Sequence, residues 1–212
     1  MAPPATGLLL PSGPWALVEP VVAAAASDGV DALWVRDDGA PTARLAVLGR
    51  RYAGRLGLVV DPERRLPSVL AKELASLDRL VEGRLEVAVP AWSEAGLDTL
   101  EVFTGLWSPR PFSYRGVTIA LEDARCLPGP RQVPRPRLWA LGRSAPSGRA
   151  AELADGWLVA GARPGRPSPA VTDYRRREGA LVGVVVPDGP GADPGAWWAE
   201  EADLVLRDPE AR

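Results

Sequence analysis

The chain has 212 residues, 46% hydrophobic and 25% charged, so it can bury a core and is not disordered by composition. Its net charge of -2 gives no sign of a nucleic-acid partner or of binding to an anionic membrane. It contains no histidine, which excludes Ser-His-Asp and Cys-His catalysis and histidine-based zinc sites. Acid–base chemistry must therefore use carboxylates, Tyr, the single Lys72, Cys126, water or a cofactor.

Short runs rich in Leu and Val alternate with helical patterns along the chain. The strands are expected at residues 7–10, 31–35, 56–60, 85–89, 138–141, 157–160, 181–186 and 204–206. The helices are expected between them, at residues 17–27, 42–53, 67–82, 94–107, 146–154, 170–177 and 194–201. Gly29 and Gly83 follow two of these helices, where glycine favours an end.

The helix that begins at Pro67 has the clearest periodicity. Its expected apolar stripe consists of Val69, Leu70, Leu74, Leu77, Leu80 and Val81. Between the fourth and fifth strands, residues 112–121 indicate a short hairpin, and the proline-rich residues 127–136 indicate an extended segment.

Eight apolar strands separated by helices predict parallel pairing, because each parallel return needs a crossover. Eight strands also close a (β/α)8 barrel of TIM type, here as a single domain over residues 1–212. A doubly wound open sheet is the alternative. Such a sheet usually carries a glycine-rich first turn, and residues 11–14 (PSGP) do not have that pattern.

The lone Cys126 excludes an internal disulfide, which is typical of a reducing compartment. The apolar run at residues 21–26 is too short to cross a bilayer. We therefore expect a cytoplasmic protein with no membrane partner, no metal and an inert cysteine.

In such barrels the functional residues lie on the loops that follow the C-terminal ends of the strands. The polar and aromatic residues at these positions are Ser12, Asp37, Asp38, Asp61, Arg64, Trp92, Ser93, Arg143, Ser144, Ser147, Arg163 and Asp188.

The loop at residues 143–148 is the best candidate for binding a phosphate. Ser144 or Ser147 can cap the next helix, and Pro146 suits its first turn. A helix N-terminus attracts anions, and Arg143 adds donors matched to phosphate oxygens. An ordinary capped helix is the alternative interpretation.

Asp37 and Asp38 are adjacent carboxylates at a strand end. One of them could accept a proton if the other, or burial, raised its pKa. The alternative is a pair of solvated loop acids. Residues 61–65 could contact a phosphate or a substrate. The alternative is a local turn.

The eight tryptophans have different expected roles. Trp92 follows the fourth strand, where it could stack on a ring. Trp34, Trp139 and Trp157 are expected in the core. The pair at residues 197–198 is expected to mark a subunit interface.

Four segments occur in a characteristic order: residues 29–37 (GVDALWVRD), 67–84 (PSVLAKELASLD…GR), 106–116 (LW…FSYRG) and 136–157 (PRLWALGRS…RAAELADGW). In this order they resemble the luciferase-like monooxygenase superfamily of flavin- and deazaflavin-dependent oxidoreductases. The resemblance implies a β/α barrel, FMN or a deazaflavin coenzyme in its mouth, and a small organic substrate. It also implies a homodimer or heterodimer packed through the early helices.

The resemblance places the cofactor phosphate at the serine loop, with Gly142, Arg143, Ser144 and Ser147. Asp38 stands where the family commonly has a catalytic His, and residues 85–91 lack the family's Gly-x-Gly.

Three functions follow from these observations. The first is a flavin- or deazaflavin-dependent oxidoreductase or monooxygenase. The second is a non-catalytic flavin-binding or silent partner subunit, which the missing His and glycines favour. The third is an unrelated barrel that binds another phosphorylated ligand through the same loop.

Overall fold

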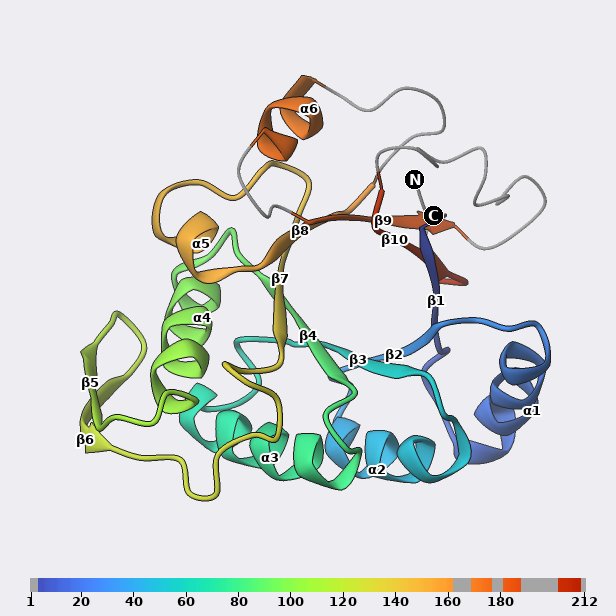
Figure 1. The fold of residues 1–212 in the computed structure, drawn as a ribbon, viewed down its shortest axis with the longest axis horizontal. Helices are drawn as coiled ribbons and strands as arrows, with labels where there is room; N and C mark the ends of the chain where they lie inside the picture. The colour runs from blue at the N-terminus through green and yellow to red at the C-terminus, as the bar shows by residue number, and fades with distance from the viewer. Residues whose placement is uncertain (1–3, 162–168, 177–180, 188–201, 211–212) are drawn as a thin grey trace.

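The chain folds as a closed ring of eight parallel strands, and Figure 1 looks into this ring. The computed structural model describes residues 4–161, 169–176, 181–187 and 202–210. Around the ring the order is β1-β10-β9-β8-β7-β4-β3-β2. The bounds are β1 (Ala5–Leu9), β2 (Ala32–Arg36), β3 (Arg55–Val59), β4 (Leu85–Pro90), β7 (Arg137–Gly142), β8 (Gly156–Val159), β9 (Leu181–Pro187) and β10 (Leu204–Asp208). The predicted (β/α)8 barrel is confirmed.

Helices cover the outside of the ring, as Figure 1 shows most clearly for the first four. The helices in the described ranges are α1 (Trp15–Ser27), α2 (Pro41–Arg51), α3 (Pro67–Leu80), α4 (Glu94–Leu106), α5 (Gly148–Leu153) and α6 (Pro169–Arg175). All eight strands were predicted to within two residues at each end. The helix expected at residues 194–201, the tryptophan pair within it, Arg163 and Asp188 lie outside the described residues.

The apolar stripe of α3 is narrower than the sequence predicted. Leu70, Leu74 and Leu77 are buried, but Val69 and Leu80 are 51% and 59% exposed. On a helix, steps of three and four residues connect positions in more than one row. Val69 and Leu80 belong to a row beside the buried one, so the same spacing leaves them exposed. None of the described helices has the length and hydropathy needed to cross a membrane.

The connection from β4 to β7 leaves the barrel, and hydrogen bonds to buried carboxylates hold it against the helices. It contains the antiparallel hairpin of β5 (Phe112–Arg115) and β6 (Ala120–Ala124). Asp98 on α4 accepts hydrogen bonds from the Tyr114 hydroxyl at 2.6 Å and from the Thr118 amide at 2.6 Å. Asp78 on α3 accepts hydrogen bonds from the amides of Arg131 and Gln132 at 2.8 and 2.9 Å.

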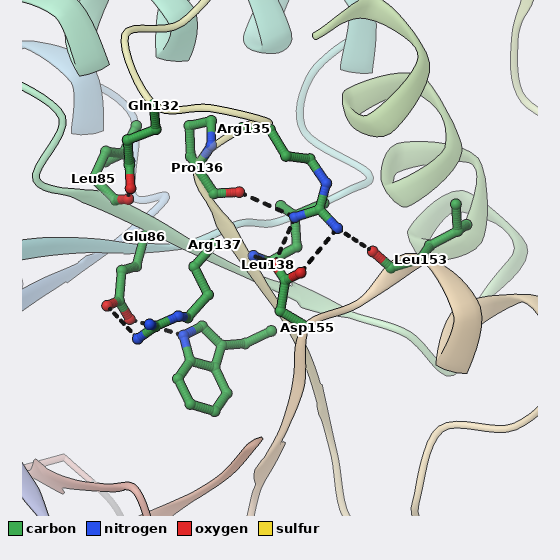
Figure 2. A network of polar contacts seen from close by, with 10 residues as sticks. Leu85, Glu86, Gln132, Arg135, Pro136, Arg137, Leu138, Leu153 and Asp155 are labelled. Atoms are coloured by element: carbon green, nitrogen blue, oxygen red, sulfur yellow. Dashed lines mark hydrogen bonds and ion pairs between the residues drawn. The ribbon is translucent and has the colours of Figure 1, made fainter. Parts of the chain in front are cut away.

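A third carboxylate fixes the entry into β7, as Figure 2 shows. Asp155 pairs with Arg135 at 2.5 Å and accepts the amide hydrogen of Leu138 at 2.8 Å. These contacts hold the start of β7 in place at the N-terminal end of the barrel.

The same end of the barrel contains a buried charge cluster. Glu86 on β4 is 3% exposed and pairs with Arg55 and, at 3.1 Å, with Arg137. Its other carboxylate oxygen accepts a hydrogen bond from the Trp139 indole at 2.8 Å. Two guanidinium groups and an indole thus compensate one buried carboxylate, which would be costly alone.

Two tryptophans fill the interior of the ring. Trp34 on β2 and Trp139 on β7 are at most 1% exposed and cluster with aliphatic residues of the facing strands. A Cβ at Gly57 would lie 1.9 Å from Cδ2 of Trp34, and one at Gly156 would lie 2.8 Å from the Trp139 ring. Trp157 is also buried, but it packs outside the strands against Tyr174, so all three tryptophans lie in the core as predicted.

We predict that Gly57→Ala lowers the free energy of unfolding by about 2–3 kcal/mol, because the new methyl group overlaps the indole of Trp34. Chemical denaturation measures the effect. The matched control is Gly129→Ala, whose Cβ would meet nothing closer than 3.8 Å and which should change stability by less than about 0.5 kcal/mol. Equal stability of the two variants would contradict the role assigned to Gly57.

Candidate functional site

A cavity of about 560 Å³ opens at the C-terminal ends of β4, β7 and β8. Its volume is in the usual range for a small-molecule site. The lining residues are Ala91, Trp92, Ala140, Leu141, Gly142, Arg143, Ser144, Ala145, Pro146, Ser147, Ala150 and Ala160. All five residues expected to bind a cofactor are in this lining.

The loop after β7 supplies the polar part of the wall, but it is not the capped helix start that the sequence predicted. Helix α5 begins at Gly148, after Pro146, and has only six residues. Ser147 occupies the position before the helix, yet its hydroxyl makes no capping hydrogen bond. Because the chain continues extended through Ser147 before it turns, this hydroxyl stays available to a ligand.

Arg143 is the charged group of this cavity. No carboxylate is among the lining residues, and within the described part of the chain Arg143 has no ion pair. Its guanidinium lies over Gly161, where a Cβ would come within 3.4 Å of Cζ. The wall therefore carries a positive charge that protein groups do not neutralise, which favours an anionic ligand.

Trp92 forms the apolar edge of the cavity. It is 70% exposed, unusual for so large a ring, and it follows β4 directly. A Cβ at Gly142 would lie 3.7 Å from Cε3 of Trp92, so Gly142 keeps the space beside the ring open. The neighbouring Ser93 has a structural task, since its hydroxyl accepts the Gly96 amide at the start of α4.

The two aspartates at the end of β2 do not line this cavity. The side chain of Asp37 is fully buried, with Oδ1 at 3.5 Å from Nε of Arg65. Asp38 pairs with Arg44 of α2 at 3.0 Å. Burial raises the pKa of Asp37 above its ordinary value, and the nearby Arg65 opposes that shift.

Residues 61–65 form a local turn beside Asp37. Asp61 accepts the amide hydrogen of Glu63 at 3.1 Å, and Arg64 donates to the Asp37 carbonyl at 3.0 Å. Cys126 lies elsewhere, and burial raises the pKa of its thiol, as an unreactive cysteine requires.

Arg36 is a residue of the mouth that the sequence reasoning missed. It pairs with Asp208 of β10 at 2.6 Å and with Glu210 at 3.1 Å, while Glu210 also accepts the amide hydrogen of Ser12. The strand between β2 and β10 is β1, which lies four strands from β7 in either direction around the ring. This cluster and the cavity therefore occupy opposite sides of the mouth. The sequence signal that could have identified Arg36 is its position as a single arginine at the end of an apolar strand.

A family model described as luciferase-like monooxygenase matches residues 6–181. The chain belongs to the luciferase-like monooxygenase family. Among solved structures, the coenzyme F420-dependent tetrahydromethanopterin reductase from Methanopyrus kandleri is 17% identical, with a TM-score of 0.69 over 88% of this chain and 67% of that chain. Monooxygenase RslO1 from Streptomyces bottropensis is 18% identical, with a TM-score of 0.64 over 90% of this chain and 74% of that chain.

A third similar solved structure is a complex with FMN. It is the oxygenating constituent of 3,6-diketocamphane monooxygenase from Pseudomonas putida, 13% identical, with a TM-score of 0.58 over 87% of this chain and 58% of that chain. At such identities the likeness establishes the shared barrel. Among the described residues of the present chain, no group of three or more acidic or Cys side chains is placed to hold a metal.

We predict that Asp37→Asn stabilises the protein at pH 7 and that the gain shrinks as the pH falls. The unfolded carboxyl has a pKa of 3.8 and the folded one a higher pKa, so the wild type loses stability as pH rises through that window. Arg65 keeps its contacts with Glu73 and the Gly39 carbonyl in the variant. Thermal unfolding between pH 4 and pH 8 measures the difference.

The matched control is Asp38→Asn, which breaks the ion pair with Arg44 and should give no gain at pH 7. A constant difference between Asp37→Asn and the wild type across this pH range would contradict the assigned cause.

Proposed function

We propose that this chain is a flavin- or deazaflavin-dependent oxidoreductase of the luciferase-like family, with the cofactor phosphate held at residues 142–147. The observation that carries the proposal is Arg143, which has no ion pair with any described residue, in a cavity whose lining contains no carboxylate, together with Ser144 and Ser147. A guanidinium and two hydroxyls suit a phosphate monoester or diester, since all of them can donate to its oxygens.

The apolar side of the cavity suits the cofactor ring. Trp92 offers an uncovered indole face beside Gly142, and ring stacking on such a face contributes about 1–3 kcal/mol. When bound, the cofactor supplies hydride transfer or, for a flavin, oxygen activation. This chain's residues bind the phosphate, orient the ring over the mouth and leave its free side to a small organic substrate.

Proton transfer by Asp38 or Asp37 stays a prediction. Burial raises the pKa of Asp37, as a proton acceptor requires, but its fully buried side chain must become accessible before it can reach a substrate. The ion pair of Asp38 with Arg44 must open before that carboxylate can reach a substrate.

A second candidate function is a non-catalytic flavin-binding subunit. It is favoured by the absence of histidine from the chain and by the position of both aspartates outside the cavity. Consumption of a reduced cofactor in the presence of substrates, with and without a partner protein, separates the two candidates. Cofactor binding without turnover under both conditions would support the non-catalytic subunit.

We predict that Arg143→Gln weakens FMN binding about tenfold and leaves riboflavin binding unchanged, because only FMN carries the phosphate. Ser144→Asp should abolish FMN binding through charge repulsion. Fluorescence titration measures both ligands, and the deazaflavin coenzyme is titrated against its phosphate-free form in parallel. Ser68→Asp, which adds the same charge at the first turn of α3, is the control and should bind normally.

Equal losses for FMN and riboflavin in Arg143→Gln would place the phosphate elsewhere. Failure of the folded wild type to bind any of these ligands would overturn the proposed function as a whole.

We also propose that a second copy of this chain covers the outer face of α2 and α3. An apolar groove runs between these helices, and Val69 and Leu80 are exposed along it by 51% and 59%. A two-fold contact through this face would bury these apolar side chains on both copies.

We predict that Val69→Asp converts a dimer into a monomer, because each copy would place a carboxylate in the apolar contact. Light scattering after size-exclusion chromatography measures the mass. Val117→Asp, at a 70% exposed position on the hairpin, is the control and should remain dimeric. A monomeric wild type at high micromolar concentration would refute self-association and leave a heterodimer.

A further inference from the structure

A second cavity, of about 750 Å³, lies on the flank of the barrel between the end of α4 and residues 126–135. Helix α4 runs back from the mouth, and residues 126–135 lead into the start of β7. The cavity is therefore at the opposite end of the barrel from the site proposed for the cofactor. Nothing in the proposed function uses it.

Hydrogen bonds between protein groups hold the walls of this flank cavity in place before any ligand binds. The Trp107 indole donates to the Ala71 carbonyl at 2.9 Å. The side chain of Gln132 donates to Asp78 at 2.8 Å, and Arg135 is held by Asp155 at 2.5 Å. A cavity that is already formed in this way binds a ligand without a large ordering cost.

The lining is mainly apolar and partly uncovered. It includes the ring of Trp107, several prolines and two large aliphatic side chains, Leu127 and Val133, which are 69% and 93% exposed. Apolar side chains exposed around a concave surface mark a place where a ligand can remove hydrophobic area from water.

The charges of the flank cavity all have one sign. Three arginines line it and no carboxylate does. Arg135 is neutralised by Asp155 behind the wall. Among the described residues, no carboxylate pairs with the guanidinium groups of Arg110 and Arg125, so two positive charges face the cavity uncompensated.

We propose that this flank cavity is a binding site for an apolar organic anion, a molecule with a hydrophobic body and one carboxylate or sulfonate. The body packs against Trp107, Leu127 and Val133, and the anionic group pairs with Arg110 and Arg125. The volume suits a medium-chain acyl group or a fused aromatic ring system. Such a ligand gains binding free energy from both the apolar lining and the two arginines. An inorganic anion would gain none from the apolar lining.

The test compares two fluorescent probes that differ by one charge. Anilinonaphthalene sulfonate carries the sulfonate, and N-phenyl-1-naphthylamine is the same body without it. We expect the sulfonate to bind the wild type more tightly. In the double variant Arg110→Gln, Arg125→Gln its affinity should fall about tenfold, and that of the neutral probe should not change.

The matched control is Arg115→Gln, which removes an exposed arginine from the hairpin and should bind both probes as the wild type does. Within the described part of the chain, neither Arg110 nor Arg125 makes a side-chain hydrogen bond or ion pair, so the double variant should unfold at the wild-type temperature.

Two results would overturn the proposal: equal sulfonate affinity in the wild type and the double variant, or an equal loss of affinity for the neutral probe in the double variant. The first would show that the probe binds elsewhere, such as the barrel mouth or the groove between α2 and α3. Neither result depends on whether the chain binds a flavin.

Discussion

The fit between two indole rings and the glycines that face them is the constraint on which the barrel depends. Eight strands fix the radius of the ring, so the volume inside it has to be filled to normal density. Here Trp34 and Trp139 take much of that volume, and Gly57, Gly156 and Gly183 provide the room. Any larger residue at these glycines would force the strands apart and displace the loops that form the mouth.

The polar groups at the two ends of the ring follow from this packing. At the N-terminal end, the Trp139 indole needs an acceptor, and Glu86, which provides it, needs Arg55 and Arg137. At the mouth, charge is divided. At β1, β2 and β10, Arg36 is paired with carboxylates, whereas at β4, β7 and β8 the guanidinium of Arg143 has no ionic partner among the described residues. The described part of the second side therefore offers an unpaired cation to an anionic ligand.

The sequence predicted the barrel well, because continuous Leu- and Val-rich runs and helical spacing are local properties. The five residues expected to bind a cofactor line one cavity, because parallel strands bring their C-terminal loops together, whereas Asp37 and Asp38 lie outside it. The sequence predicted a helix capped by Ser144 or Ser147 with Pro146 in the first turn, but α5 begins at Gly148 and Ser147 precedes it without a capping hydrogen bond, since the point at which the loop turns into α5 depends on packing. It missed the pair of Arg36 with Asp208, which joins residues 172 positions apart.

The position of β1 between β2 and β10 has a consequence for how the chain acquires its structure during synthesis. β1 pairs on one side with β2, which follows it closely along the chain, but on its other side with β10, at residues 204–208. Until residues 204–210 have been synthesised, this edge of β1 has no partner strand, and Arg36 lacks both of its carboxylate partners.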